Sequence, residues 1–526
     1  MRTIPLEAPR FRAAGGRLSG GWPTLAIIAL IVAAAAALIA TASLPSHQIL
    51  GSILAFGGLI LVIHWRNTPV VTIAIVMFLA LSSRPTVEIA SVNVRVEQPS
   101  ILFLAGYTML TSRELLGPLV RRYRLLIIGL LTWLTAAAAA SAFVAPEPVA
   151  SLRIVIWLGV SFIAAGVAAV MAARVARYEA VIGALVLAAT VHVGIAVLAA
   201  ASGRLLGVDW GGYGKSGPDY GFRATGLAWE FNIFSSGTAI AIPLAISRYL
   251  GSGRRVDLAV VGILGLGVWL ALTRTVFAAL AVGLVIYLAL LLWRDRAGVR
   301  RWLPRFATAA LAIAVGVGAG ALVNVATSSA KPGLLAERVP ARDVAVLPAP
   351  PTSAPGSATI PSTPVPGPTP AESDPAGSAM PSQSLPRLLS VDLGDTSSME
   401  FRLVRLRQSL ADLPASLWIG LGANSFGQRH ADPSQGFRSD YLGMLPFTIL
   451  YDAGLIGLAG FLVFVAGTVS HMVQSRGGPV AIAFVASFAI MLMSYVMTDA
   501  LRFASNWVLI GAALGLAYRG QAGRQS

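Results

Sequence analysis

Arginine residues at the edges of long apolar segments are the first feature of this sequence that points to chemistry. Arg274 is the charged residue of "LALTRTVFAALAVGL", and a guanidinium at membrane depth costs roughly 2.5 to 3.5 kcal/mol. This group keeps its charge and binds phosphate or carboxylate oxygens through paired hydrogen bonds. The free-energy cost of placing Arg274 at this position favours an anionic partner, either within the protein or in a ligand.

Residues of the types that bind anions or transfer protons gather around the later apolar segments. The candidate catalytic residues are Arg274, Glu230, His430 and Asp440, and the candidate substrate-binding residues are Arg223, Arg402, Arg405, Asn424, Arg438 and Asp452. A positioned carboxylate or imidazole base typically contributes about 10²–10⁴-fold to a rate. The chain has no cysteine, and its five histidines lack metal-site spacing, so we expect neither a metal nor another cofactor.

Each candidate also has a structural interpretation. Arg274 suits an arginine at the lipid interface or an ion pair with Glu230 or Asp452, and Glu230 also suits a helix cap. His430 alone fits a solvated surface histidine, the loop arginines fit contacts to anionic lipid headgroups, and His192 fits an interhelical hydrogen bond. The glycines of "GLGANSFG" and "GLIGLAG" fit turns and helix packing. The functional interpretation is favoured because these candidate residues are all predicted to lie on one side of the membrane.

The composition requires a bilayer as the solvent of most of the chain. Of its 526 residues, 56% are hydrophobic and 12% are charged, and the mean hydropathy is +0.75. The net charge of +16 alone suggests a nucleic-acid partner. Most arginines, however, lie in short connectors between apolar runs, where they set membrane orientation. We therefore expect membrane lipids as partners and no nucleic acid.

Apolar runs long enough to cross the hydrocarbon core recur along the chain. They lie near 24–43, 49–64, 69–82, 99–112, 125–145, 153–172, 178–201, 228–247, 256–272, 275–293, 306–325, 443–468, 478–498 and 503–518. The pattern predicts an all-α, polytopic bundle of about 12–14 transmembrane helices. Its predicted parts are a leader (1–23), a main bundle (24–325), a large loop (326–442), C-terminal spans (443–518) and a tail (519–526).

The orientation of these spans follows from the arginine-rich connectors. With the leader on the cytoplasmic side, alternate connectors such as "TSRELLGPLVRRYR" and "WRDRAGVRRWLPR" also lie there, and the intervening ones carry less arginine. This alternation predicts a multi-pass protein of the cytoplasmic (inner) membrane with both termini in the cytoplasm. The large loop is then external.

The large loop divides into two parts of different composition. Residues 347–386 are rich in Pro, Ser, Gly and Ala, which predicts disorder because such a segment buries too little apolar area. Residues 397–414 predict an amphipathic helix with a capping box and an apolar stripe that includes Leu403, Leu406 and Leu410. Arg402 and Arg405 share another face, so the helix suits the outer membrane surface.

Four passages together resemble a known family. They are "RATGLAWEFN" (223–232), "LTRTVFAALAVGL" (272–284), "FRLVRLRQSLADLPASLWIGLGANSFG" (401–427) and "LYDAGLIGLAGFL" (450–462). In order and topological placement they resemble the motifs of the O-antigen ligase/polymerase superfamily, which are integral-membrane glycosyltransferases that use undecaprenyl-diphosphate-linked sugars. The resemblance covers roughly residues 220–465.

This resemblance implies roles for the matched positions. Arg223, Arg274 and Arg402 would bind the diphosphate of a lipid-linked oligosaccharide donor, and Asp452 would support the site. The family's histidine base, usually about ten residues before "GxxGL", is missing, because that place reads "YLGMLPF". His430, Asp440 and Glu230 are the alternative bases.

The expected reaction is the attack of an acceptor hydroxyl on the anomeric carbon of the donor sugar, with polyprenyl diphosphate as the leaving group. The acceptor is a glycan or a lipid, so polymerisation and ligation of cell-surface glycan both stay open. Preorganised arginines would stabilise the charge that develops on the leaving group. A flippase or transporter of lipid-linked sugars is the main alternative, although the chain lacks the paired, interrupted spans typical of inverted repeats.

Overall fold

The protein is described here from a computed structural model of the 526-residue chain. The structure describes residues 69–82, 86–89, 92–95, 97–175, 177–205, 213–215, 222–228, 230–296, 298–329, 397–430, 442–474, 479–496 and 503–522. Two predicted spans (24–43 and 49–64), the predicted disordered segment 347–386, and the candidates Arg438 and Asp440 lie outside these residues.

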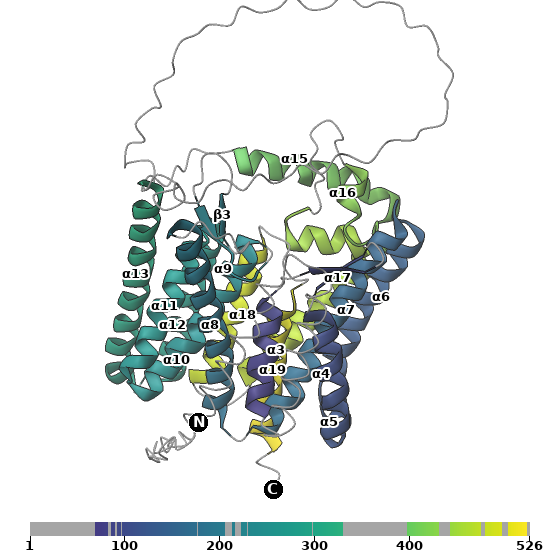
Figure 1. Ribbon diagram of the computed structural model, residues 1–526. Coiled ribbons are helices and arrows are strands. Elements are labelled where there is room, and N and C mark those ends of the chain that lie inside the picture. Colours follow the sequence, from purple (N-terminus) through teal and green to yellow (C-terminus); the bar gives the residue numbers. More distant parts are fainter. Residues whose placement is uncertain are drawn as a thin grey trace, which may run out of the picture.

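The described chain is a bundle of helices with two short β-hairpins (Figure 1). The helices are α3 Pro69–Leu81, α4 Glu97–Thr111, α5 Arg113–Arg122, α6 Arg124–Phe143, α7 Pro148–Arg174, α8 Tyr178–Leu205, α9 Phe231–Ala239, α10 Ile242–Ser252, α11 Arg255–Leu270, α12 Arg274–Arg294, α13 Val299–Ser329, α15 Ser397–Asp412, η2 Leu413–Ser416, α16 Ser425–Arg429, α17 Leu445–Gln474, α18 Pro479–Val496 and α19 Ala504–Ala522. Strands β1 Thr86–Ile89 and β2 Val92–Arg95 pair antiparallel, as do β3 Tyr213–Lys215 and β4 Phe222–Ala224.

These helices confirm an all-α, multi-pass membrane fold. Within the described residues, eight helical segments are long and apolar enough to cross a membrane, with α9 and α10 counted as one segment. Each predicted span from 69–82 onward coincides with a helix, and the span at 228–247 is divided into α9 and α10. We call the end of the bundle that carries α15 and α16 the α15 end, and the opposite end, which carries α5, the α5 end (Figure 1).

Small residues allow the membrane helices to touch through their backbones. A Cβ atom added to Gly129 on α6 would lie 2.6 Å from the carbonyl oxygen of Gly460 on α17. Between α7 and α19, a Cβ on Gly515 would lie 2.2 Å from the carbonyl oxygen of Ala169. Such contacts are the usual basis of helix association in lipid. The packing role predicted for the glycines of "GLIGLAG" is therefore confirmed at Gly460.

His192 on α8 accepts a hydrogen bond, although its partner differs from the one expected. Its Nε2 atom accepts from the backbone N–H of Leu227 at 3.1 Å. Leu227 lies in the turn between β4 and α9 rather than on a helix. Because Nε2 accepts, the neutral imidazole carries its proton on Nδ1. His192 thus holds the turn that leads to Glu230.

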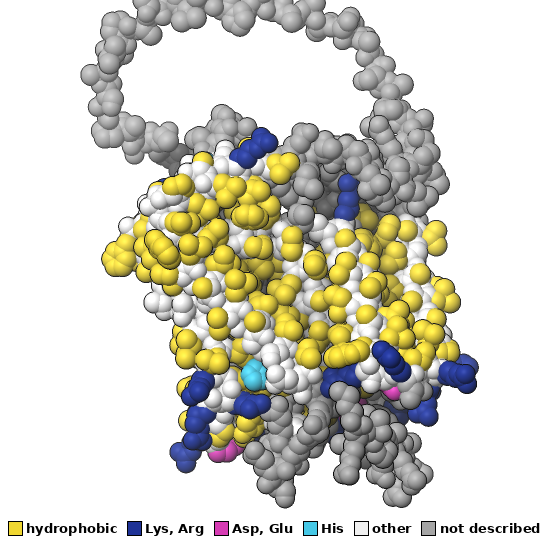
Figure 2. All heavy atoms as spheres, turned by 180° about the vertical axis from the view of Figure 1, so that it is seen from behind, with side chains coloured by type: hydrophobic (Ala, Val, Ile, Leu, Met, Phe, Trp, Pro, Cys, Tyr) yellow, Lys and Arg dark blue, Asp and Glu magenta, His cyan; other side chains and the backbone are white. Residues whose placement is uncertain are grey.

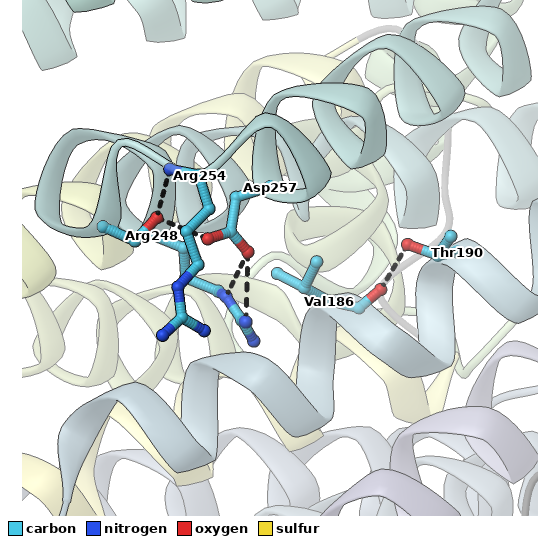
Figure 3. A network of polar contacts seen from close by, with 6 residues as sticks. Val186, Thr190, Arg248, Arg254 and Asp257 are labelled. Atoms are coloured by element: carbon cyan, nitrogen blue, oxygen red, sulfur yellow. Dashed lines mark hydrogen bonds and ion pairs between the residues drawn. The ribbon is translucent and has the colours of Figure 1, made fainter. Parts of the chain in front are cut away.

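Basic side chains gather at the α5 end, where a closed polar network joins α10 to α11. On the face drawn in Figure 2, most Lys and Arg side chains lie below a broad apolar belt. In Figure 3, Nε and Nη2 of Arg248 approach Oδ1 of Asp257 at 3.2 and 3.1 Å. The Ser252 hydroxyl donates to the other oxygen of Asp257 and accepts from the backbone N–H of Arg254. Both oxygens of this buried carboxylate are therefore satisfied, as folded proteins require.

Candidate functional site

Helix α17 is broken near the α15 end. Gly454 has φ 64° and ψ −167°, which lies outside the helical region and interrupts the ladder of hydrogen bonds. The part after the break, Leu455–Gln474, has twenty residues and extends about 30 Å, enough to cross the hydrocarbon core by itself. With Leu455–Gln474 as the spanning part, the break would lie at the membrane boundary and not at the midplane.

The segment 417–422 supplies the hydrogen-bond partners that the break removes from α17. The backbone N–H groups of Leu421 and Gly422 donate to the carbonyls of Tyr451 and Asp452 at 2.7 and 3.2 Å. In the other direction, the N–H groups of residues 455 and 456 donate to the carbonyls of Leu417 and Trp418 at 2.9 and 3.1 Å. The loop thus supplies backbone partners to a helix that comes later in the chain, as buried backbone groups require.

Glycine is required on both sides of this junction. A Cβ on Gly420, whose φ is 85°, would lie 2.5 Å from the backbone nitrogens of Ala453 and Gly454. A Cβ on Gly454 would lie 2.4 Å from the carbonyl of Trp418. Any side chain here would meet backbone, which cannot move aside as a flexible side chain can. The two glycine motifs of the sequence, which separately indicate a turn and helix packing, meet at this point.

Three side chains form a hydrogen-bonded group beside the junction. Oδ2 of Asp412, at the end of α15, lies 2.7 Å from Nε2 of His430 and accepts from the Tyr451 hydroxyl at 2.7 Å. A carboxylate oxygen only accepts, so His430 carries a proton on Nε2, and Nδ1 is the nitrogen that can take up another. The His430 ring also packs on Phe426, with ring centroids 4.7 Å apart. Asp412 and His430 are partly exposed, at 25% and 24% of their side chains, so solvent or a ligand reaches them.

Asn424 and Asp452 meet on the other side of the same junction. Oδ1 of Asp452 accepts from the backbone N–H of Asn424 at 3.1 Å. Asn424 has φ 58°, a left-handed conformation that Asn tolerates better than most residues, and it directly precedes α16. The turn before α16 is therefore tied to α17 through Asp452. His430 directly follows the end of this short helix.

Helix α15 turns a polar face inward. Arg405 and Ser409 are buried, while Leu403, Val404 and Leu410 are 46 to 50% exposed. Leu403 and Leu410 of the predicted apolar stripe are therefore exposed, whereas Leu406 is half-buried and Leu413 is buried. An outward apolar face on a helix that crosses the α15 end suits contact with lipid (Figure 1).

The remaining sequence candidates lie in or directly before α12, α9, β4 and α15. Arg274 is the first residue of α12 and is exposed, and Glu230 directly precedes α9 and is half-buried. Arg223 is in β4 and Arg402 is in α15, and the side chains of both fall outside the described residues. The contacts described above join His430 to Asp412, and Asn424 to Asp452.

Asp412 and Tyr451 were not predicted from the sequence. Asp412 ends the loop helix in "SLADL", and Tyr451 precedes Asp452 in "LYDAGL". A tyrosine and an aspartate beside two glycine motifs give only a weak signal. Their partnership joins positions 39 residues apart, which no local spacing reveals.

The sequence matches no protein-family model, and a search of curated proteins finds no significant match. The function of the protein is therefore inferred from the residues of this chain.

Proposed function

We propose that this protein is a membrane glycosyltransferase that polymerises or ligates cell-surface glycan from a polyprenyl-diphosphate-linked donor. The α15 end would be the external face of the cytoplasmic membrane. The observation that carries the proposal is the Asp412–His430–Tyr451 group beside the break in α17, at the boundary between lipid and water. The headgroup of a lipid-linked sugar lies at this depth, because its chain stays in the bilayer.

His430 is the proposed general base. Asp412 holds Nε2 of its ring as the protonated nitrogen, as an aspartate orients the histidine in hydrolytic triads, and Tyr451 fixes the same carboxylate. Nδ1 would accept the proton of the acceptor hydroxyl as the hydroxyl oxygen forms a bond to the anomeric carbon. The bond from that carbon to the diphosphate oxygen breaks, and polyprenyl diphosphate leaves with the electron pair.

The leaving diphosphate needs positive charge rather than a proton. Arg274, together with Arg223, Arg402 and Arg405, is the proposed source, and Arg438 would join them. Preorganised donors aimed at developing charge often contribute more to catalysis than any other effect, especially where water is scarce. Asp452 and Asn424 would maintain the junction that positions His430. Glu230 and Asp440 are alternative bases.

A flippase for lipid-linked sugars is the competing proposal, since transporters also use broken helices. Transporter breaks expose half-helix ends to a substrate near the midplane. In α17 the break lies about 30 Å from the far end of the helix, and its backbone groups are occupied by residues 417–422. This arrangement favours chemistry at the membrane surface.

Two matched pairs of variants test the proposal. His430→Ala is compared with His471→Ala, and Arg274→Ala and Arg274→Lys are compared with Arg294→Ala, which lies at the other end of α12. Membranes that contain each variant receive the lipid-linked saccharides extracted from a strain that lacks the gene, and glycan transfer is measured. We expect His430→Ala to lower the rate by at least tenfold and both Arg274 variants to abolish transfer, with normal protein levels.

Full activity of His430→Ala would remove His430 from the mechanism, and full activity of both Arg274 variants would do the same for Arg274. The deletion strain separates the two proposals. Lipid intermediates that accumulate on the outer leaflet support a transferase, and accumulation on the inner leaflet supports a flippase.

A further inference from the structure

A second cluster of charged and aromatic residues lies at the α15 end, apart from the His430 group. The guanidinium carbon of Arg95, at the end of β2, lies 4.7 Å from the ring centroid of Trp157 on α7 and 5.0 Å from that of Phe503. The guanidinium carbon of Arg153, one helical turn before Trp157, lies 5.5 Å from the Trp157 centroid. One indole therefore orients two cations, which is a favourable arrangement for arginine.

The hydrogen-bonding capacity of this cluster is incompletely used. Glu97, the first residue of α4, is 6% exposed and approaches Nη1 of Arg95 at 3.7 Å through Oε1. Its Oε2 atom is buried, and so is Nε of Arg153, and neither has a hydrogen-bond partner among the described residues. An unmet buried polar group usually costs about 1–3 kcal/mol, so two in one cluster call for an explanation.

The composition of the cluster specifies the ligand chemistry. Among the described residues it holds two arginines and one carboxyl, and its buried donor without a hydrogen-bond partner there is Nε of Arg153. The guanidinium of Arg153 carries N–H groups whose spacing matches phosphate oxygens. Burial raises the pKa of Glu97 from 4.5 to about 7, with Arg95 opposing the rise. A protonated Glu97 would add an O–H donor.

The cluster is near the His430 group but separate from it. Gln428, two residues before His430, donates from Nε2 to the Ser151 hydroxyl at 3.1 Å, and its Oε1 accepts from the N–H of residue 147 at 3.1 Å. Ser151 lies two residues before Arg153 on α7. Arg153 is five residues after the start of that helix, or about 8 Å along its axis, and so lies near the α15 end of α7.

We propose that Arg95, Arg153 and Glu97, held against Trp157, form a binding site for the phosphoryl oxygens of a membrane lipid. The polyprenyl diphosphate of a sugar donor and an ordinary anionic phospholipid offer the same chemistry. Binding at this site goes beyond the proposed transfer reaction and does not require it.

Sulfate is a suitable probe, because it resembles phosphate and its charge does not change between pH 5.5 and 8.5. The full-length protein, purified in a zwitterionic detergent, is titrated with sulfate by calorimetry. We expect Arg153→Ala to weaken binding by about tenfold or more and Arg153→Lys to weaken it less. Arg174→Ala, a change at the other end of α7, should leave binding unchanged. Equal binding by the wild type and Arg153→Ala, or equal loss in Arg174→Ala, would overturn the proposal.

The pH dependence provides a readout that a purely structural role would not produce. Among the described residues, the charged group that faces Glu97 is Arg95 from β2; Arg153 from α7 and the uncharged Phe503 belong to the same cluster through their aromatic contacts. Wild-type binding of sulfate should strengthen as the pH falls through about 7, because Glu97 gains a proton and stops competing for Arg95. Glu97→Gln should bind at pH 8 as the wild type does at pH 6. A pH slope retained in this variant would remove Glu97 from the site.

Competition identifies the source of the phosphoryl group. Micelles that contain polyprenyl diphosphate or phosphatidylglycerol are added to the sulfate complex, with phosphatidylcholine as the control. Displacement by polyprenyl diphosphate alone assigns the site to the donor, and displacement by both lipids assigns it to headgroups in general. If neither lipid displaces sulfate, the site does not bind lipid phosphoryl groups and the proposal fails. None of these outcomes depends on the activity of His430 variants.

Discussion

Asp257 and Glu97 are two buried carboxylates near opposite ends of the bundle, and they differ in how fully they are paired. Their exposures are nearly equal, at 7% and 6%. Asp257 accepts from both Arg248 and Ser252. Glu97 pairs with Arg95 through Oε1 at 3.7 Å, and its Oε2 atom has no hydrogen-bond partner among the described residues. Burial alone therefore does not mark a functional charge. A buried charged residue whose polar atoms lack hydrogen-bond partners is the stronger indication of a ligand site.

The two ends also use glycine differently. Gly253 ends α10 with φ 65°, and a Cβ there would lie 3.2 Å from the flexible end of Arg305. Gly454 has a similar φ, but a Cβ there would meet the backbone of Trp418 at 2.4 Å. A close approach of two backbones leaves no side chain that can give way.

The largest expected effect comes from this glycine pair. Gly454→Ala should prevent the loop from joining α17 and cost more than about 4 kcal/mol, because positive φ and a backbone clash act together. Gly253→Ala should cost only about 1–2 kcal/mol, mostly from φ. Thermal unfolding in detergent, followed by fluorescence-detected size exclusion, measures both variants. Equal melting temperatures would contradict the proposed importance of the junction.

Asp257→Asn should have the next largest effect. It removes the charge opposite Arg248 and should lower the free energy of unfolding by about 3 kcal/mol. The loss lies at the low end of the range for buried pairs, because the Arg248 side chain is 34% exposed. Sulfate binding should not change, since this end of the bundle has a structural ion pair. A changed affinity for sulfate would undermine the contrast between the two ends.

Glu97→Gln should act in the opposite direction at high pH. Since the folded protein raises the pKa of Glu97 from 4.5 to about 7, its contribution to stability is fully present below pH 4.5 and is lost as the pH rises to about 7. Glutamine does not titrate, so the variant should be more stable than the wild type by about 2 kcal/mol at pH 8 and nearly equal at pH 5. Melting temperatures at the two pH values test this expectation, which fails if the variant is less stable at both.

Ser252→Ala should have the smallest effect. It removes one hydrogen bond to Asp257 and one from the N–H of Arg254, at a net cost of about 1 kcal/mol. Thermal unfolding of this variant, with Asp257→Asn and the double variant, gives the coupling between the two residues. A double variant that loses the sum of both single effects would show that the network is not coupled.

Most of the fold was predictable from the sequence, because a bilayer imposes a minimum length on each apolar helix. The run at 275–293, for example, corresponds to α12, which begins at Arg274. The sequence of α5 indicates a connector and not a helix, because it contains several charged residues and Pro118. The hairpin β1–β2 is also not predicted, because strands of four residues give almost no periodic signal.

The candidate site was less predictable, and the reason is physical. His430, Asn424 and Asp452 were selected by residue type, which sequence reveals directly. The junction between the loop and α17 forms through backbone atoms, which every residue carries. Only the glycines at its closest contacts are therefore visible in the sequence. The contact of Arg95 on β2 with Trp157 on α7 depends on packing between segments that are distant in the sequence.

The junction also leaves α17 an alternative pattern of backbone hydrogen bonds. If residues 417–422 withdrew, the N–H groups of Leu455 and Ile456 would stand four residues from the carbonyls of Tyr451 and Asp452, the pairing of an unbroken helix. Helix α17 would then satisfy these backbone groups within itself. The hydrogen-bonded group of Asp412, His430 and Tyr451 therefore lies beside the one place in α17 where the helix takes its backbone partners from another part of the chain.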